Sequence, residues 1–191
     1  MVITIDGPAG VGKSTVAALV AERLGLRYVN TGAMYRELTA VALSRGVSLN
    51  DGEALVALVG EPPPDGADLR SEAISGNVSS VARHPQVRAR MRARQRELAQ
   101  DAVLEGRDTG SVVCPQAELK VFLVASSRVR AERRARQLRL PVDQVERTIV
   151  ERDGLDSEQS APAADAVLVD TGGMNASQVA DRIVELAREL A

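Results

Sequence analysis

The sequence has very little of the chemistry that several classes of protein require. Its 191 residues hold one cysteine, Cys114, and one histidine, His84. A lone cysteine cannot form an internal disulfide, so we expect Cys114 to be a small apolar residue in a reducing compartment. His84 has no companion at metal-ligand spacing, which favours a surface or capping role. No apolar run reaches the roughly 18 residues that a membrane span requires.

Excess charge and lysine are scarce as well. The net charge is only −2 at pH 7, which argues against a general nucleic-acid or membrane-surface binder. The chain opens on Met1–Asp6 with no basic segment before a long apolar stretch, so we expect a cytoplasmic protein. Only two of the 24 basic residues are lysines, Lys13 and Lys120. Because lysine is so rare in this arginine-rich chain, Lys13 is a candidate for a specific role.

The composition that is present suits one globular domain. Hydrophobic residues make up 45 % and charged residues 26 % of the chain. On folding, a chain of this size buries about 70 % of the surface that it exposes when unfolded. Short apolar runs typical of buried strands recur along the sequence. The predicted strands are Val2–Ile5, Leu26–Val29, Ala102–Leu104, Leu119–Val124 and Ala166–Val169.

Helical spacing separates these strands, which predicts a mostly parallel sheet covered on both faces. The predicted helices are one carrying Val16 to Leu24, then Ala33–Ser44, Gln86–Gln100, Arg128–Leu138, Val142–Arg152, and a last helix capped by Asn175. Two segments break the pattern. Glu61–Gly66 contains three consecutive prolines and predicts a linker or the boundary of an insert. Asp153–Ser160 is polar and predicts a mobile loop.

The motif G-x-x-x-x-G-K-S/T occurs at Gly7–Ser14, directly after the first predicted strand and at the start of a helix. We call Gly7–Ser14 the P-loop. Glycines let successive backbone N–H groups turn inward onto a phosphate, and the helix N-terminus adds partial positive charge. Lys13 can reach the β and γ phosphates of ATP, and the Ser14 hydroxyl can join the Mg²⁺ shell. The predicted ATP-binding residues are Gly7, Pro8, Ala9, Gly10, Val11, Gly12, Lys13, Ser14 and Thr15.

A P-loop by itself does not distinguish a switch, a motor and a kinase, and a glycine-rich turn without a ligand is the plainest alternative. GTPase switches read guanine with an Asn/Thr-Lys-x-Asp segment, and Lys120 is followed by Phe122 where that aspartate would stand. Large ATPase machines need a longer chain. A short chain with many arginines outside the P-loop instead favours a small kinase that holds two anionic substrates together.

Two further segments follow predicted strands, where loops form the ligand crevice of α/β folds. In Thr31–Arg36 (TGAMYR), Arg36 could reach an acceptor phosphate or could be an ordinary solvated helix residue. In Glu105–Gly110 (EGRDTG), Arg107 and Asp108 form a charged pair between glycines at a strand end. Such a pair suits a binding site better than a core.

Together these segments resemble the bacterial cytidylate (CMP) kinases, of the nucleoside monophosphate kinase family. The segments that carry the resemblance are Ile3–Pro8 with the P-loop, Thr31–Arg36, Val78–Ala82, Pro85–Arg88, Arg94–Arg96, Glu105–Val113 and Arg152–Ser157. They occur in the family's order and run nearly from end to end. The resemblance implies phosphoryl transfer from Mg²⁺-ATP to CMP or dCMP, with no nucleic-acid or membrane partner, by a monomer.

The resemblance also implies a P-loop NTPase three-layer α/β fold: one kinase domain (1–191) with a parallel sheet, a small acceptor-binding insert and a mobile lid. The core would span about 1–45 and 100–191, the insert about 46–99 and the lid about 134–160. Catalysis would involve Lys13, Arg36, Arg107 and Asp108. The implied acceptor contacts are Ser79, Arg88 and Asp108 to cytosine, Arg36 and Arg107 to the CMP phosphate, and Arg152 and Asp156 near the ribose and the closing lid.

The base assignment is chemically sensible. A carboxylate such as that of Asp108 accepts from the N4 amino group of cytosine, and Arg88 donates to N3 or O2. Uracil reverses the polarity at N3 and position 4, which would leave buried groups opposed. The alternative for Asp108 is a scaffold role in which it pairs with Arg107 or another arginine.

The sequence departs from the family pattern in two places. The region from about Val47 to Ile74 is shorter than the insert of longer members, and Gln159 stands near the place of an expected lid arginine. Four other arginines could compensate: Arg130, Arg133, Arg134 and Arg147. A kinase for another nucleoside monophosphate or a small metabolite is the close alternative, and a non-catalytic nucleotide-binding switch is the more distant one.

Overall fold

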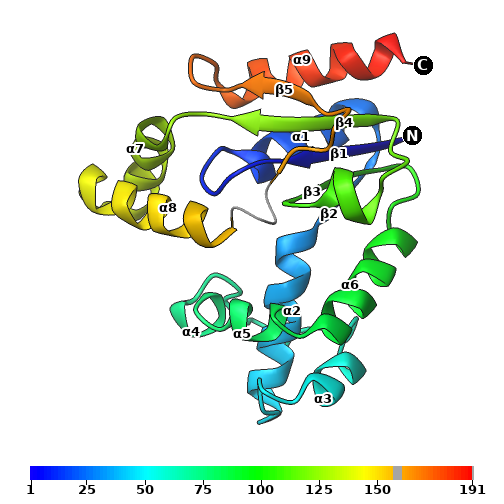
Figure 1. Ribbon diagram of the computed structural model, residues 1–191, viewed down its shortest axis with the longest axis vertical. Helices are drawn as coiled ribbons and strands as arrows, with labels where there is room; N and C mark the ends of the chain where they lie inside the picture. The colour runs from blue at the N-terminus through cyan, green and yellow to red at the C-terminus, as the bar shows by residue number, and fades with distance from the viewer. Residues whose placement is uncertain (157–160, 191) are drawn as a thin grey trace. The chain divides into compact units, whose positions relative to one another are not determined.

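A five-stranded sheet forms the framework in the computed structural model, which describes residues 1–156 and 161–190. The strand order is β2-β3-β1-β4-β5 (Figure 1). β1 pairs in parallel with β3 and β4, and β4 pairs in parallel with β5. The strands are β1 Val2–Asp6, β2 Arg27–Asn30, β3 Ala102–Gly106, β4 Leu119–Val124 and β5 Val167–Asp170. The predicted parallel α/β sheet is confirmed.

Helices connect these strands, as the sequence pattern predicted. They are α1 Lys13–Leu24, α2 Thr31–Ser44, α3 Gly52–Ala57, α4 Glu72–Ser75, α5 Val78–Ala82, α6 Pro85–Glu97, α7 Ser127–Leu138, α8 Val142–Asp156 and α9 Ala176–Glu189. A short π-helix, η1, spans Thr109–Val113. The short helices α3 to α5 and η1 were not predicted. Within the described residues, none of these helices is long and apolar enough to cross a membrane.

Helix boundaries follow local signals in the sequence. Gly25 ends α1 in the left-handed conformation with φ 65°, as expected of a glycine stop. Asn175 caps α9 in a complete capping box, in which its side chain accepts from the Gln178 N–H and the Gln178 side chain accepts from the Asn175 N–H. These predicted boundaries are confirmed.

Backbone contacts divide the chain into two compact units. The first contains Met1–Val29 and Ala99–Ala191, and the second contains Asn30–Leu98. The second unit therefore includes α2 as well as α3 to α6. The smaller insert and the lid implied by the resemblance remain predictions.

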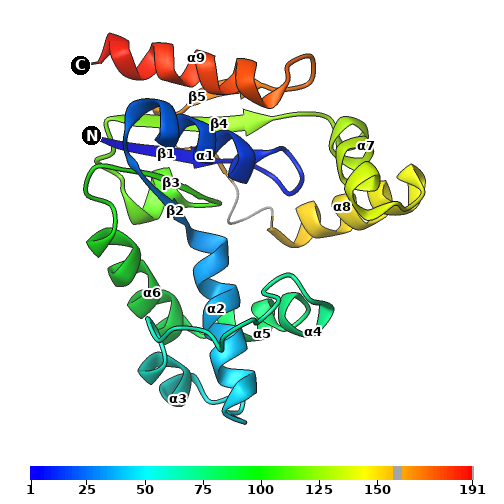
Figure 2. The same cartoon turned by 180° about the vertical axis from the view of Figure 1, so that it is seen from behind.

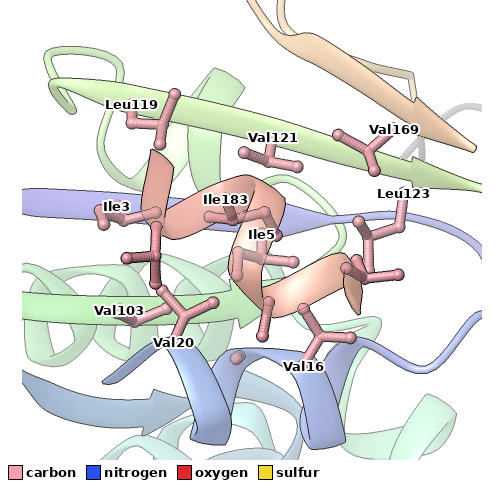
Figure 3. Packing of buried hydrophobic residues seen from close by; sticks show 14 of the residues in the cluster. Ile3, Ile5, Val16, Val20, Val103, Leu119, Val121, Leu123, Val169 and Ile183 are labelled. Carbon is pink, nitrogen blue, oxygen red and sulfur yellow. The ribbon is translucent and has the colours of Figure 1, made fainter. Parts of the chain in front are cut away.

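The main core of the first unit lies against one face of the sheet. Figure 3 shows aliphatic side chains of β1, β3, β4 and β5 packed with those of α1 and α9, and Figure 2 shows the same elements as ribbons. Ile3 and Ile5 of β1 and Ile183 of α9 are completely buried. Burying one such side chain contributes about 1.5–3 kcal/mol. The packing fixes β1, from which the P-loop emerges.

The second unit has its own apolar cluster, made by α2, α3, α5 and α6. Leu38 and Val41 of α2 pack with Leu55 of α3, Val81 of α5 and Met91 of α6. Because these helices bury a common cluster, they hold one another in place within this unit. Glu61–Gly66 forms neither helix nor strand, as predicted.

Helices α7 and α8 pack on each other through Ala131, Ala135, Val145 and Ile149. The prediction of a loop beginning at Asp153 is wrong for residues 153–156, which form the last turn of α8. The physical reason lies outside the local sequence: the Arg130 guanidinium of α7 holds the Asp153 carboxylate at 2.6 Å. The rest of the predicted loop, residues 157–160, lies outside the described residues.

Candidate active site

The P-loop joins the end of β1 to the start of α1. A side chain at Gly7 would place its Cβ 2.6 Å from the carbonyl oxygen of Leu123 in β4, and the φ of Gly7 is +149°. Gly12, which precedes α1, has φ +103°. Other residues rarely adopt these conformations, so the glycines of the motif are required by the backbone path itself. The glycines of the motif thus allow the backbone conformation of the loop, and the close approach of β4 requires a glycine at position 7.

The carbonyl oxygens at the start of the P-loop accept hydrogen bonds from cationic side chains. Lys13 Nζ donates to the carbonyls of Gly7 at 2.8 Å and Pro8 at 2.9 Å. Arg107, which follows β3, donates from Nη1 to the same Gly7 carbonyl at 2.9 Å. Lys13 and Arg107 thus meet at one backbone oxygen. Two of the predicted catalytic residues are brought together here.

Two arginines of α7 hold the rest of the P-loop. Arg130 Nη1 donates to the Ala9 carbonyl at 3.0 Å, and Arg133 Nη1 donates to the Val11 carbonyl at 3.3 Å. Arg133 also bonds Thr171, which ties the loop to the segment after β5. With their carbonyls so engaged, the peptide units of the loop can orient N–H groups toward an anion.

The other two arginines named as substitutes for the lid arginine make local contacts. Arg134 donates to the Gln137 side chain at 3.4 Å, and Arg147 donates to the Asp143 carbonyl at 3.3 Å, each on its own helix. Of the four candidates, Arg130 and Arg133 are therefore the two with described contacts to the P-loop backbone.

A buried carboxylate faces the hydroxyl that was predicted to bind Mg²⁺. Ser14 Oγ donates to Glu105 Oε1 at 2.7 Å, and Tyr28 Oη donates to the same oxygen at 3.3 Å. Glu105 is 4 % exposed and lies in β3, beside β1 in the sheet. Sequence reasoning placed Glu105 in a motif without giving it a role. The available signal was an acidic residue inside the apolar strand Ala102–Gly106.

This hydroxyl–carboxylate pair fits a magnesium ion. Mg²⁺ prefers oxygen ligands and is usually held by one or two protein groups together with substrate phosphates and water. Because the Ser14 proton points toward Glu105, the remaining lone pairs of the hydroxyl are available to a cation. No group of three or more His, Cys, Asp or Glu side chains that could hold a metal ion occurs within the described residues.

The segment after β3 is anchored by a buried acid at the end of β1. Asp6 Oδ1 accepts from the Thr109 hydroxyl at 2.7 Å and Thr109 N–H at 3.1 Å, and Oδ2 accepts from Gly110 N–H at 2.8 Å. Burial raises the pKa of Asp6 above its ordinary value, although these three bonds act in the opposite direction. Arg107 and Asp108, just before these anchors, are half-buried.

Three predicted acceptor residues lie in the second unit, on helices that share its apolar cluster. Arg36 is half-buried on α2, Ser79 is exposed on α5, and Arg88 is half-buried on α6 beside the buried Val87. Their roles stay predictions. Arg152 and Asp156 belong to the last turns of α8, and their side chains lie outside the described residues.

The first unit thus combines three features that phosphoryl transfer requires. It has a phosphate-binding loop with a lysine, a hydroxyl and a carboxylate suited to a divalent cation, and an Arg-Asp pair tied to the same loop. Positioning and charge neutralisation account for most of the catalysis in this class of reaction. The Gly7 carbonyl, which binds both Lys13 and Arg107, joins the first of these features to the third.

Known proteins are similar to this chain in sequence. Residues 3–189 match the family described as "Cytidylate kinase". The cytidylate kinase of Geobacillus thermodenitrificans is 44 % identical over 215 residues, covering 98 % of this chain and 96 % of the relative. That of Deinococcus deserti is 42 % identical over 196 residues, covering 94 % and 95 %. The longer alignment exceeds the 191 residues of this chain, so the Geobacillus relative carries additional residues.

The fold also resembles that of a solved P-loop kinase. Shikimate kinase from Acinetobacter baumannii superposes with a TM-score of 0.55 at 16 % identity, covering 98 % of this chain and 92 % of that one. Similarity at this identity concerns the fold alone, whereas the family match spans nearly the whole chain. The chain belongs to the cytidylate kinase family.

Proposed function

We propose that the protein transfers the γ-phosphoryl group of Mg²⁺-ATP to CMP, and also to dCMP, to give the diphosphate and ADP. The observation that carries this proposal is the shared Gly7 carbonyl, which joins Lys13 of the P-loop to Arg107 of the Arg-Asp segment. A loop that binds a donor phosphate and an arginine suited to an acceptor phosphate are thereby held together. The family match supports cytidine as the nucleoside.

On the donor side, the P-loop N–H groups and the N-terminus of α1 bind the ATP phosphates. Lys13 exchanges its contacts with the Gly7 and Pro8 carbonyls for contacts with the β and γ phosphates, where it neutralises negative charge. Ser14 and Glu105 hold the cation from the side of β3. The cation held there would supply charge neutralisation for the phosphates of ATP.

On the acceptor side, Arg36 and Arg107 hold the CMP phosphate in line with the γ-phosphoryl group. Asp108 accepts from the cytosine amino group, Arg88 donates to N3 or O2, and Ser79 completes the base contacts. The resemblance also assigns Arg152 and Asp156, whose side chains lie outside the described residues, to the neighbourhood of the ribose. No covalent enzyme intermediate is needed, because alignment and charge neutralisation provide the catalysis.

A coupled assay of ADP formation with CMP, dCMP, UMP, AMP, GMP and dTMP tests the proposal. We expect CMP and dCMP to give the highest kcat/KM. Preference for AMP, GMP or dTMP would contradict the base assignment and favour another monophosphate kinase. Tight ATP binding without ADP formation from any acceptor would favour a nucleotide-binding switch.

The metal assignment needs a separate experiment. In a Mg²⁺ titration at fixed ATP, we expect Ser14→Ala and Glu105→Gln each to require more Mg²⁺ for half-maximal rate, because each removes one side of the cation site. Arg182→Gln serves as the control, since the described contact of Arg182 is with Glu185 on its own helix, α9. Wild-type Mg²⁺ dependence in both site variants would contradict the assignment.

The proposal includes a monomer that acts in the cytoplasm. The apolar cluster within the second unit is compatible with a monomer, since it is made by helices of a single chain. Size-exclusion chromatography with light scattering, with and without ATP and CMP, measures the oligomeric state. A dimer in either condition would contradict this part of the proposal.

A further inference from the structure

Asp6 is a buried acid that the proposed chemistry does not use. It is the last residue of β1 and is 5 % exposed. The two residues before it, Thr4 and Ile5, are completely buried. Burying a carboxylate is costly unless donors satisfy it. Its contacts therefore indicate what keeps it there.

All three described hydrogen bonds of the Asp6 carboxylate are accepted from two adjacent residues, Thr109 and Gly110. Thr109 donates through its N–H and its hydroxyl to Oδ1, and Gly110 donates through its N–H to Oδ2. Both oxygens act as acceptors, an arrangement that a carboxylate satisfies and an amide does not. These two donor residues directly follow Arg107 and Asp108 in the chain.

The residue after Asp6 holds the other side of the same segment. The Gly7 carbonyl accepts from Arg107 Nη1 at 2.9 Å. Asp108 therefore stands between two attachments to the end of β1, one through Arg107 and one through Thr109 and Gly110. This double attachment restricts the backbone from which the Asp108 side chain projects.

The P-loop does not depend on the Asp6 carboxylate in the same way. Lys13 bonds the Pro8 carbonyl, Arg130 bonds the Ala9 carbonyl, and Arg133 bonds the Val11 carbonyl. Loosening Asp6 from Thr109 and Gly110 would leave these attachments in place. The acceptor and donor sides of the reaction should then respond differently.

We propose that Asp6 is a positioning residue for acceptor recognition: its carboxylate orients Asp108 and Arg107 toward the nucleoside monophosphate. The inference rests on the proposed function, in which these two residues contact CMP. Asp6 itself touches no substrate. Its role is transmitted through the backbone N–H groups of Thr109 and Gly110.

Kinetics of Asp6→Asn test the role. The amide would turn an NH₂ group toward the Gly110 N–H. Both groups are donors, so one of the three hydrogen bonds is lost and the Gly110 N–H has no acceptor there. We expect the KM for CMP to rise and the CMP-to-UMP ratio of kcat/KM to fall, each by about tenfold, because a buried donor is left unsatisfied. The KM for ATP should stay within about twofold of wild type.

A pair of substitutions at Thr109 supplies a gentler version of the same test. Thr109→Val keeps the shape of the side chain and removes only the hydroxyl donor, whereas Thr109→Ser keeps that donor. We expect a fall in the CMP-to-UMP ratio of about threefold in the valine variant and a ratio near wild type in the serine variant. This pair decides the matter where Asp6→Asn does not fold.

The outcomes separate the two proposals. Wild-type protein that does not use CMP would overturn the proposed function and the positioning role with it. Wild-type protein that uses CMP, with an unchanged CMP-to-UMP ratio in Asp6→Asn and Thr109→Val, would overturn the positioning role alone. Equal increases in the KM values for ATP and CMP would likewise show that Asp6 only stabilises the fold.

Discussion

The P-loop and the segment Arg107–Gly110 are held by opposite kinds of contact. Cationic side chains bind the carbonyl oxygens of the P-loop, at Gly7, Pro8, Ala9 and Val11. An acid, Asp6, binds the N–H groups of the second segment. The described contacts therefore bind carbonyl oxygens in the P-loop and N–H groups in the second segment.

The difference separates two ways of recognising a substrate. In the P-loop, the bound carbonyls allow the backbone N–H groups to face a phosphate, and the proposed function therefore assigns donor recognition to the backbone. In the second segment, Asp6 holds the backbone at Thr109 and Gly110, and the proposed function assigns acceptor recognition to the side chains of Arg107 and Asp108. Changes in the first should alter the rate, and changes in the second should alter the choice of acceptor.

Lys13→Ala should give the largest effect, because it removes a P-loop attachment and the cation that the proposed function places at the β and γ phosphates. We expect a decrease in kcat on the order of a hundredfold, equivalent to about 3 kcal/mol in the barrier. Circular dichroism and thermal unfolding should be close to wild type, since Lys13 belongs to no apolar cluster. Near-normal kcat at saturating substrates would show that this loop is not the catalytic cradle.

Gly110→Ala should disturb the second segment through its packing. A Cβ at Gly110 would lie 2.7 Å from Thr4 Oγ1, in a fully buried position. We expect the free energy of unfolding to fall by about 1–3 kcal/mol, as for other overpacked sites. Urea denaturation measures the change.

Gly173→Ala is the matched control for Gly110→Ala. Nothing lies within 4 Å of a Cβ at Gly173, so its free energy of unfolding should remain within about 0.5 kcal/mol of wild type. Equal stability of the two alanine variants would contradict the tight seating of Gly110.

Asp108→Asn should change the choice of acceptor more than the rate of transfer. The amide can both donate and accept, so it can turn its NH₂ group toward the oxygen at position 4 of uracil. We expect the CMP-to-UMP ratio of kcat/KM to fall by more than roughly tenfold. Steady-state kinetics with both monophosphates measure the ratio. A uniform loss for both substrates would make Asp108 a scaffold residue and leave base recognition to Ser79 and Arg88.

Asp165→Asn should have the smallest effect, away from both segments. Lys120 Nζ donates to Asp165 Oδ2 at 2.7 Å, and this bond lowers the pKa of Asp165 below its ordinary value of 3.8. Because the folded-state pKa is lowered, the stabilisation is present above the ordinary pKa and is lost as pH falls through the folded value.

Urea denaturation across a pH series tests the Asp165 prediction. The variant should be slightly less stable than wild type near neutral pH, and the difference should disappear in strong acid. Phosphoryl transfer should be unaffected, since the described contacts of Lys120 are with Pro115 and Asp165. A difference in stability that grows as the pH falls would contradict the sign of the pKa shift.

Much of the first unit could be predicted from local sequence. The strand Val2–Asp6, the glycine stop at Gly25 and the cap at Asn175 each depend on neighbouring residues, and each is confirmed. The last turn of α8 was predicted wrongly because Asp153 is polar and precedes a glycine. Its ion pair with Arg130, 23 residues earlier, overrides that local preference.

In the candidate site, too, local sequence predicted some features, whereas contacts between distant residues could not be predicted from it. The P-loop could be located from its sequence motif alone. The roles of the proposed acceptor-binding residues came from the resemblance and stay predictions; these residues are Arg36, Ser79, Arg88 and Asp108. Glu105 received no role, because nothing local says that its carboxylate reaches Ser14, 91 residues away.

The sequence by itself determined the alternation of strands and helices, the glycine-dependent course of the P-loop and the family. Periodicity, caps and glycine conformations act over a few residues, so a single chain displays them. Only the tertiary structure decided that Arg107 shares a carbonyl with Lys13 and that Asp6 holds Thr109, 103 residues away. Those contacts exist because β1 lies between β3 and β4 in the sheet. The order of strands is set by packing over the whole core, which no local pattern encodes.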